Sequence, residues 1–169
     1  RGQALRDDDP DRRGIFTTAI VCVAEGHSLA LFFTGPRHAG ENLREVLLRR
    51  AEELPRPIQM CDALDRNVPK DLEVILANCL SHGRRRFVEL VDVFPQEVTC
   101  ILEALKQAYQ VDAEAKQQNL SAEERLRLHQ QRSGPVMEEL HRWLEAQFAQ
   151  KKVEPNSSLG LAIAYLLRH

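Results

Sequence analysis

One carboxylate, Asp62, stands where a short apolar run ends and a turn begins. The run Ile58–Cys61 follows Pro57 and predicts a short buried strand, which would place Asp62 at the carboxyl edge of a sheet. In open α/β sheets that edge is where ligands and metal ions are held. Many strand-end aspartates instead cap the next turn through a hydrogen bond to its backbone. Asp62 is therefore a candidate catalytic acid or a turn residue, with Asp65 in the same loop as a weak candidate for a second metal ligand.

A second apolar run, Val74–Cys79, ends beside a histidine, His82, at a spacing of three residues. Cys79 and His82 could be two zinc ligands, but a structural zinc site needs four ligands and the sequence has no second Cys/His pair. The alternative, which the sequence favours, is a buried thiol at a strand end followed by a histidine near a helix start.

The densest positive charge in the chain follows at once, in Arg84, Arg85 and Arg86. Guanidinium groups bind phosphates in bidentate geometry, so these arginines are candidate phosphate ligands on the same presumed edge as Asp62. Arginine clusters on helices are also commonly just solvated. Trp143 lies beside an apolar helical stripe, and we expect it in the core rather than as a stacking platform.

Composition restricts the classes of protein that these residues could serve. The chain has 169 residues, 43% hydrophobic and 28% charged, which suits one domain or a small domain with a helical appendage. The formal charge of −2 gives no bulk attraction to nucleic acid, so any DNA contact must come from a local basic patch. Four dispersed cysteines, no signal peptide and no membrane-length apolar run favour a reducing cytoplasmic compartment.

The first half of the chain predicts strands with one helix. Residues 1–12, with Asp7, Asp8 and Asp9, predict an exposed loop, in which the acid triplet is a solvated run rather than a metal site. Runs at 15–23 and 28–34, joined through Gly26, predict a β-hairpin. Both runs are nearly continuous, so we expect the sheet to be covered on both faces.

Between the hairpin and the Asp62 strand the apolar period becomes helical. Leu43, Val46, Leu47 and Leu54 predict a helix from Gly40 that stops at Pro55. The order strand, strand, helix, strand, loop or short helix, strand predicts an α/β unit with one mixed sheet and a covering helix.

Beyond His82 the pattern is helical throughout. Apolar residues at 87–94 form one face, and a helix begins at Pro95. A capping box at Ser121 opens another helix, which the Ser133–Pro135 segment should interrupt or kink. A break at 154–158 precedes the last helix, over 159–167.

Several of these segments together resemble one known family. They are 31–42 (LFFTGPRHAGEN), 59–64 (QMCDAL), 77–87 (ANCLSHGRRRF), 133–135 (SGP) and 151–160 (KKVEPNSSLG). The chain from about residue 13 onward resembles the central domain of the insertion sequence 66 family of transposases.

This resemblance implies a ribonuclease H-like fold with Asp-Asp-Glu chemistry. Residues 13–86 would be a partial catalytic core and 87–169 a helical insertion. Asp62 matches the second acid, whereas the first Asp and the final Glu would lie outside the chain; Asp7, Asp8 and Asp9 do not fit the first position. Cys79 and His82 match a Cys-x-x-His element of the family.

The activity implied is cleavage and rejoining of phosphodiester bonds at transposon ends with Mg²⁺ or Mn²⁺. Asp62 would bridge two metal ions that activate water or a DNA 3′-hydroxyl. His82 and Arg84–Arg86 would lie near the DNA backbone. The partners implied are double-stranded transposon ends and target DNA, a homo-oligomer in the full-length protein, and no membrane, in a bacterial cytoplasm at the nucleoid.

We expect this piece alone to have little or no activity, because one carboxylate cannot hold two Mg²⁺ ions. Two alternatives differ in class. One is a non-catalytic module in which the helices form an interaction or DNA-positioning surface. The other is a zinc-stabilised helical regulator that uses Cys79 and His82.

Overall fold

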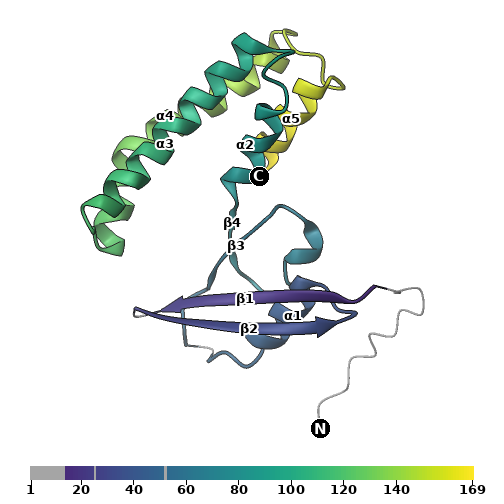
Figure 1. The fold of residues 1–169 in the computed structure, drawn as a ribbon, viewed down its shortest axis with the longest axis vertical. Coiled ribbons are helices and arrows are strands. Elements are labelled where there is room, and N and C mark those ends of the chain that lie inside the picture. Colours follow the sequence, from purple (N-terminus) through teal and green to yellow (C-terminus); the bar gives the residue numbers. More distant parts are fainter. Residues whose placement is uncertain (1–13, 25, 52) are drawn as a thin grey trace. The chain divides into compact units, whose positions relative to one another are not determined.

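The chain folds into two compact units that meet in the sequence between Cys79 and Leu80. The structure is a computed structural model, and it describes residues 14–24, 26–51 and 53–169 (Figure 1). The described part of the first unit holds four strands, one helix and a 3₁₀ turn, and the second unit is helical. The loop expected at residues 1–12, including Asp7, Asp8 and Asp9, lies outside the described residues.

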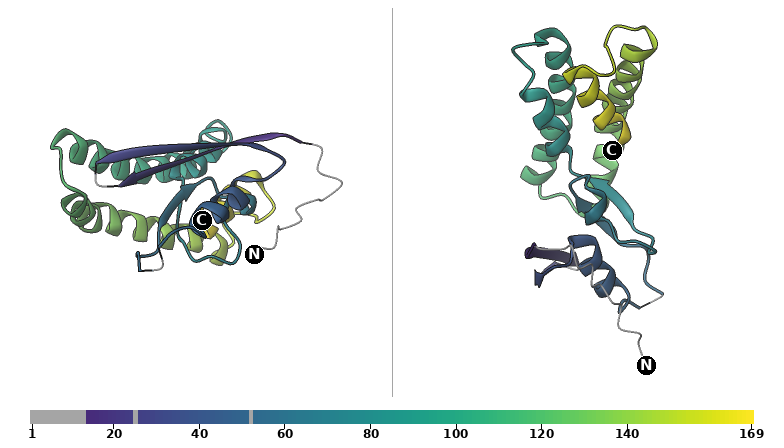
Figure 2. Two further views of the ribbon diagram at one scale, coloured as in Figure 1. Left: turned by 90° about the horizontal axis from the view of Figure 1, so that it is seen from below. Right: turned by 90° about the vertical axis from the view of Figure 1, so that its right-hand side faces the viewer.

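The hairpin predicted from the sequence is confirmed. Strands β1 (Phe16–Ala24) and β2 (His27–Gly35) pair antiparallel, with Phe16 opposite Gly35 and Ala24 opposite His27. Gly26 lies in the connecting turn with φ +77°, a conformation that side-chain-bearing residues rarely adopt. The two strands form a long ribbon that Figure 2 shows from two sides.

Helix α1 (Ala39–Leu47) covers one face of this hairpin. Asn42 Nδ2 donates a hydrogen bond of 3.2 Å to Thr18 Oγ1, and both side chains are buried. The opposite face is open among the described residues, with Val21, Val23 and Phe32 exposed by 63%, 71% and 72%. The expectation that both faces are covered is therefore wrong for this part of the chain, because one helix can shield only one face.

The third and fourth strands form a sheet of their own. Strands β3 (Ile58–Cys61) and β4 (Ile75–Asn78) pair in parallel, and within the described residues neither pairs with the hairpin. The predicted order of elements is correct, but the single mixed sheet is replaced by two sheets of two strands. Ile58 and Met60 are more than 70% exposed, so β3 is not the buried strand that was expected.

Helix α1 is shorter than its sequence pattern indicated. It ends at Leu47 rather than near Pro55, and Leu48 and Leu54 are about half exposed, at 55% and 49%. Leu54 therefore lies outside the helix that its spacing predicted.

The second unit contains α2 (Leu80–Val88), α3 (Pro95–Gln117), α4 (Ala122–Ala149) and α5 (Ser158–Arg168). Helices α3 and α4 lie side by side along most of their length (Figure 2). Helix α2 packs against α3 and α5, so it belongs to the helical unit rather than to the strands before it. The unit thus begins seven residues before the boundary at 86/87 that the sequence suggested. Its core consists of Phe87, Val98, Ile101, Leu105, Leu140, Leu144, Val153, Leu159, Ala162 and Ile163, with Trp143 packed against it as expected.

The ends of the helices follow local sequence signals. Pro95 occupies the first turn of α3. Ser121 caps α4, with its Oγ accepting from the Glu124 N–H at 3.3 Å and its own N–H donating to the Glu124 carboxylate at 2.9 Å. Both features were predicted.

Helix α4 continues without interruption through Pro135, where a break was one of the two expectations. A proline inside a helix removes one backbone hydrogen bond. Residues on both sides of Pro135 are nevertheless buried, and one of them has an additional side-chain hydrogen bond within α4. Before it, Ser133 is buried and its hydroxyl bonds His129 Nδ1 at 2.9 Å. After it, Leu140 and Leu144 lie in the core. Packing therefore outweighs the local penalty.

Ion pairs that cross between α3 and α4 include Arg125 with Asp112 and Arg132 with Glu114. None of the helices among the described residues is both long enough and apolar enough to span a membrane.

Candidate functional site

Asp62 lies directly after β3, at the edge of the parallel pair where both strands end. The Cys79 N–H donates to the Cys61 carbonyl at 2.9 Å, so the strands stay paired up to this edge. The side chain of Asp62 is half-buried. Its position at a strand end is the one predicted, although the sheet has only two strands here.

The side chain of Asp62 is held by the loop that follows it. Asn67 Nδ2 donates a short hydrogen bond to Asp62 Oδ1. Asn67 belongs to the 3₁₀ turn η1 (Asp65–Asn67), and its own carbonyl accepts from Gln59 Nε2 at 2.7 Å. Gln59 lies on β3, so strand, turn and carboxylate form one connected group. Asp62 therefore does bond to the turn that follows it, as strand-end aspartates commonly do, but its partner is the side chain of Asn67 rather than the turn backbone.

This loop is fixed in turn by α1. A Cβ at Gly40 would lie 2.3 Å from the Val68 carbonyl oxygen and 2.9 Å from the Arg66 carbonyl oxygen. Only glycine allows the start of α1 to approach the loop so closely. The helix start is itself fixed, because the His38 N–H donates to Glu41 Oε2 at 2.6 Å. Thus Gly40 determines where the turn that carries Asn67 lies.

The sheet edge at Asp62 also carries the thiol of Cys61, whose pKa is shifted by its surroundings. Burial raises the pKa of the Cys61 thiol, and the neighbouring Asp62 carboxylate raises it further, while a hydrogen bond with Gln59 opposes the shift. Cys61 is consequently a protonated, weakly nucleophilic thiol at neutral pH. It is not a candidate nucleophile.

The carboxylate oxygen of Asp62 is a hard ligand of the type that Mg²⁺ and Mn²⁺ prefer. A two-ion site needs several such groups, and no cluster of three or more His, Cys, Asp or Glu suited to a metal occurs among residues 14–24, 26–51 and 53–169. Asp65, the suggested stand-in, is exposed in η1. The described residues therefore fit a divalent ion only in part, through one ligand.

Cys79 and His82 lie on either side of the boundary between the two units. Cys79 follows β4 and is half-buried, and His82 is exposed in the first turn of α2. None of the four cysteines forms a disulfide. The described residues supply no group that would complete a zinc site around this pair.

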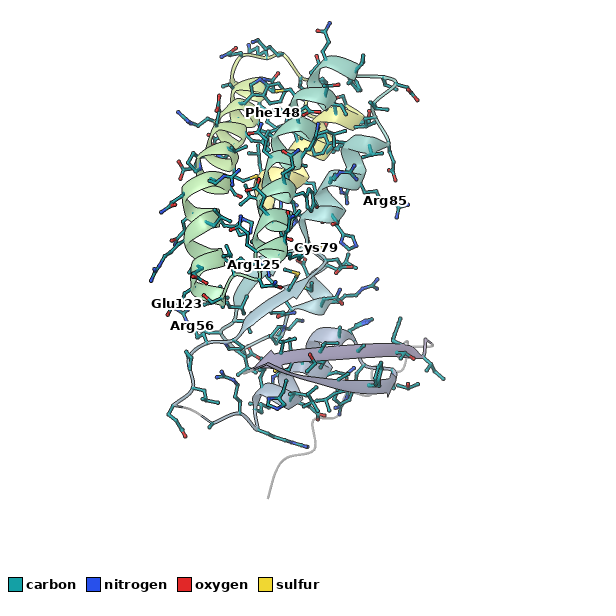
Figure 3. The ribbon with its side chains drawn as sticks, turned by 60° about the vertical axis from the view of Figure 1, so that its left-hand side comes forward. Arg56, Cys79, Arg85, Glu123, Arg125 and Phe148 are labelled. Carbon is teal, nitrogen blue, oxygen red and sulfur yellow. The ribbon has the colours of Figure 1, made fainter. Side chains whose placement is uncertain are left out.

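The three arginines do not act as one group. Consecutive residues of a helix differ by about 100° around its axis, so Arg84 and Arg86 point to different sides of α2. Arg85 pairs with Glu89 at 3.0 Å and projects away from the helix (Figure 3). Arg86 lies over the ring of Tyr165 on α5, with its Cζ 3.9 Å from the ring centroid. Arg84 is exposed.

Three contributors were missed by the sequence analysis: Asn67, Gln59 and Tyr165. Asn67 had a detectable signal, because an asparagine a few residues after a strand-end aspartate commonly organises the turn. Gln59 and Tyr165 had none, because their roles depend on contacts with groups that are distant in the sequence.

Comparison with known proteins completes this picture. The family model described as "Transposase IS66 family" matches residues 18–169, which is most of the chain. The chain belongs to the IS66 family of transposases. This membership confirms the resemblance noted in the sequence.

Two curated relatives from Sinorhizobium fredii (strain NBRC 101917 / NGR234) are similar to part of the chain. The uncharacterized protein y4jD is 39% identical over 97 residues, which cover 56% of this chain and 18% of the relative. The uncharacterized protein y4hP is 31% identical over 110 residues, covering 59% and 20%. The matched region thus spans about a fifth of the length of these relatives. No solved structure matches the chain significantly.

Proposed function

We propose that this chain is a central part of a DNA transposase of the Asp-Asp-Glu type and that Asp62 is one of its metal-binding carboxylates. The observation that carries the proposal is the position of Asp62, directly after β3 at the shared edge of two parallel strands. Its family membership supplies the chemistry that such a carboxylate would serve.

The fold proposed for the first unit is a ribonuclease H-like core that needs a further strand. Two observations support it. The hairpin and the β3–β4 pair are separate sheets among the described residues, so each has strand edges free for another partner. Large apolar side chains on both sheets are also exposed, including Val23, Phe32, Ile58 and Met60. A strand between the two sheets, carrying the first acid, would pair these edges.

Asp62 would contribute one ligand to a site for two Mg²⁺ or Mn²⁺ ions, with the other carboxylates supplied by parts of the transposase outside these residues. The ions, once bound, would activate a water or a DNA 3′-hydroxyl and stabilise the charge on the attacked phosphate. The chain's own contribution is to hold the Asp62 carboxylate. The hydrogen bond from Asn67 holds Oδ1 of Asp62 in place. Because the two oxygens belong to one carboxylate, this bond also fixes the direction of Oδ2.

The test is strand transfer by the full-length transposase carrying Asp62→Asn, with Asp65→Asn as a matched control. Loss of a residue that merely supports a metal ligand costs about 10–100-fold in activity. We therefore expect Asp62→Asn to lower the rate by more than about a hundredfold. Asp65→Asn, three residues away on the exposed turn, should retain activity. Equal activity of the two variants would refute the assignment.

The isolated 169-residue chain should not join DNA ends in Mg²⁺, because a single carboxylate cannot hold two ions that dehydrate reluctantly. Robust Mg²⁺-dependent joining by this chain would mean that the acids lie elsewhere in it.

A second candidate function is favoured by the separate core of the helical unit. A unit with its own core can serve as a DNA-positioning or interaction module, including homo-oligomer contacts, without taking part in catalysis. This alternative predicts that transposition survives Asp62→Asn but is lost when the helices are removed. The first proposal instead predicts that Asp62→Asn abolishes transposition.

A further inference from the structure

Basic residues are segregated within the helical unit. Helices α2 and α5 carry four arginines, Arg84, Arg85, Arg86 and Arg168, and no aspartate or glutamate. Helices α3 and α4 carry nine acidic and six basic residues. A unit with little net charge thus has a positive side made by two helices that pack together, and such a side attracts polyanions.

The close packing of α2 on α5 depends on Gly83. A Cβ at Gly83 would lie 3.0 Å from Leu166 Cδ1 and 3.9 Å from the Tyr165 ring. Because residue 83 has no side chain, α5 can approach α2 and bring its tyrosine beside Arg86. Gly83 and Phe87 are buried, so the side of α2 next to them lies against its neighbours.

Arg86 is held against Tyr165 by this arrangement. Its guanidinium lies over the Tyr165 ring at 3.9 Å, and the ring is 4.8 Å from that of His169. A stacked guanidinium keeps its N–H donors free at the edge of the plane while losing much of its rotational freedom. It is therefore preorganised for a bidentate contact with an oxyanion.

Three other residues accompany Arg86 around the junction of the two helices. On α2, His82 lies four residues before Arg86 and falls on the same side of the helix, whereas Arg85 lies about 100° away and pairs with Glu89. On α5, Tyr165 and Arg168 are three residues apart and share a side. Arg84 lies on the other flank of α2, about 160° from Arg86.

We propose that this α2–α5 face, defined by His82, Arg86, Tyr165 and Arg168, binds the phosphate backbone of duplex DNA, with Arg86 as its principal phosphate ligand. The choice of DNA rests on the transposase function proposed above. The proposal does not require Asp62 to be catalytic. It assigns to Tyr165 a positioning role, since the ring orients the guanidinium and does not itself contact DNA.

The test is fluorescence anisotropy of a labelled DNA duplex titrated with the 169-residue chain, in EDTA and at several salt concentrations. Arg86→Ala should weaken binding about tenfold, the loss of one charge-assisted contact. It should also lower the slope of log K against log salt by about 0.9, the value for one phosphate. Arg84→Ala removes the same charge from the same helix and should weaken binding less than about twofold, with an unchanged slope.

Substitutions at Tyr165 separate positioning from charge. Tyr165→Phe keeps the ring and should bind as the wild type does. Tyr165→Leu should weaken binding about two- to fivefold, the value of an exposed cation–π contact. Arg86→Lys keeps the charge and the exposed position but lacks the planar fork, and should fall between wild type and Arg86→Ala. Circular dichroism of each variant verifies the fold, and Arg86→Lys tests the proposal even if Tyr165→Leu does not fold.

Three results would overturn the proposal: no duplex binding by the wild-type chain at low salt, equal losses for Arg84→Ala and Arg86→Ala, or binding of an acidic peptide that is as tight as that of DNA and equally sensitive to Arg86→Ala. Failure here is distinguishable from failure of the catalytic proposal. Binding is measured without metal, and Asp62→Asn should not weaken it.

Discussion

Substitution of Gly160 by alanine adds only one methyl group, but it should destabilise the helical unit strongly. A Cβ at this position would lie 2.2 Å from the Glu154 carbonyl oxygen and 2.7 Å from the Pro155 carbonyl oxygen. Both contacts are with backbone. The Glu154 carbonyl is fixed because it accepts hydrogen bonds from the Ser157 N–H at 3.0 Å and the Ser157 hydroxyl at 2.7 Å. The new methyl group can therefore be accommodated only by moving α5.

Movement of α5 would disturb the core directly. Leu159 and Ile163 on this helix are 1% and 0% exposed. Overpacking of a well-packed site costs about 1–3 kcal/mol, and contacts this short with rigid backbone place Gly160→Ala near the upper end, at about 3 kcal/mol. With a urea m-value of about 1 kcal/mol/M for a unit of this size, the midpoint should fall by about 3 M.

The assay is urea unfolding followed by tryptophan fluorescence. Trp143 is the single tryptophan in the chain, and it packs against the core of the helical unit, so it reports on that unit alone.

Gly134→Ala is the matched control. A Cβ at Gly134, in the middle of α4, would lie 3.8 Å from its nearest neighbour, an ordinary contact. Alanine in a helix is favoured over glycine by up to about 1 kcal/mol, reduced here because a proline follows. Gly134→Ala should thus leave the midpoint unchanged or raise it slightly. A Gly160→Ala midpoint within about 0.3 M of the wild type would refute the close approach of α5 to the turn before it.

Two further predictions concern charge and exposure. Hydrogen bonds from Lys116 and Arg125 hold the pKa of Asp112 below its ordinary value of 3.8. The ionised Asp112 carboxylate therefore stabilises the folded state fully at pH values above 3.8, and this stabilisation is lost as the pH falls through the lower pKa that Asp112 has in the folded state. Acid unfolding followed by Trp143 fluorescence should thus be less steep below about pH 4 for Asp112→Asn than for the wild type, and identical pH profiles would contradict this. Phe32 is 72% exposed, so Phe32→Ser should shift the thermal midpoint of the first unit, followed by circular dichroism, by less than about 2 °C; a large drop would mean that this face is covered.

Local signals in the sequence predicted the elements that depend on neighbouring residues. The hairpin follows from two β-branched runs and Gly26, and the start of α4 from Ser121 and Glu124. These features require only short-range hydrogen bonds and backbone conformations, which are encoded within a few residues.

The sequence was less informative wherever burial or partners were involved. The continuous apolar run of β1 predicted a covered sheet, yet the outer face is open among the described residues. A continuous apolar run indicates that both faces of a strand need to be covered, but it does not indicate whether the covering elements are present. Likewise, the Ser133–Pro135 segment predicted an interruption or a kink, yet α4 continues through it, and Leu54 has the helical spacing but lies beyond the end of α1.

The candidate site was predicted in position but not in detail. Asp62 was identified from the end of its strand, whereas its connection to Asn67, and the dependence of that turn on Gly40, required the structure. The stacking of Arg86 on Tyr165 joins residues almost eighty positions apart, and no local pattern indicates it. The arginine triplet, by contrast, suggested one cluster that helical geometry disperses.

The most direct test of the central claim is a change of metal preference in the full-length transposase carrying Asp62→Cys. A thiolate is a softer ligand than a carboxylate and suits Mn²⁺ better than Mg²⁺. If Asp62 binds the metal, strand transfer by Asp62→Cys should be lost in Mg²⁺ and partly restored in Mn²⁺, while Asp65→Cys remains active in both. Activity of Asp62→Cys in Mg²⁺ equal to that of the wild type would contradict the account.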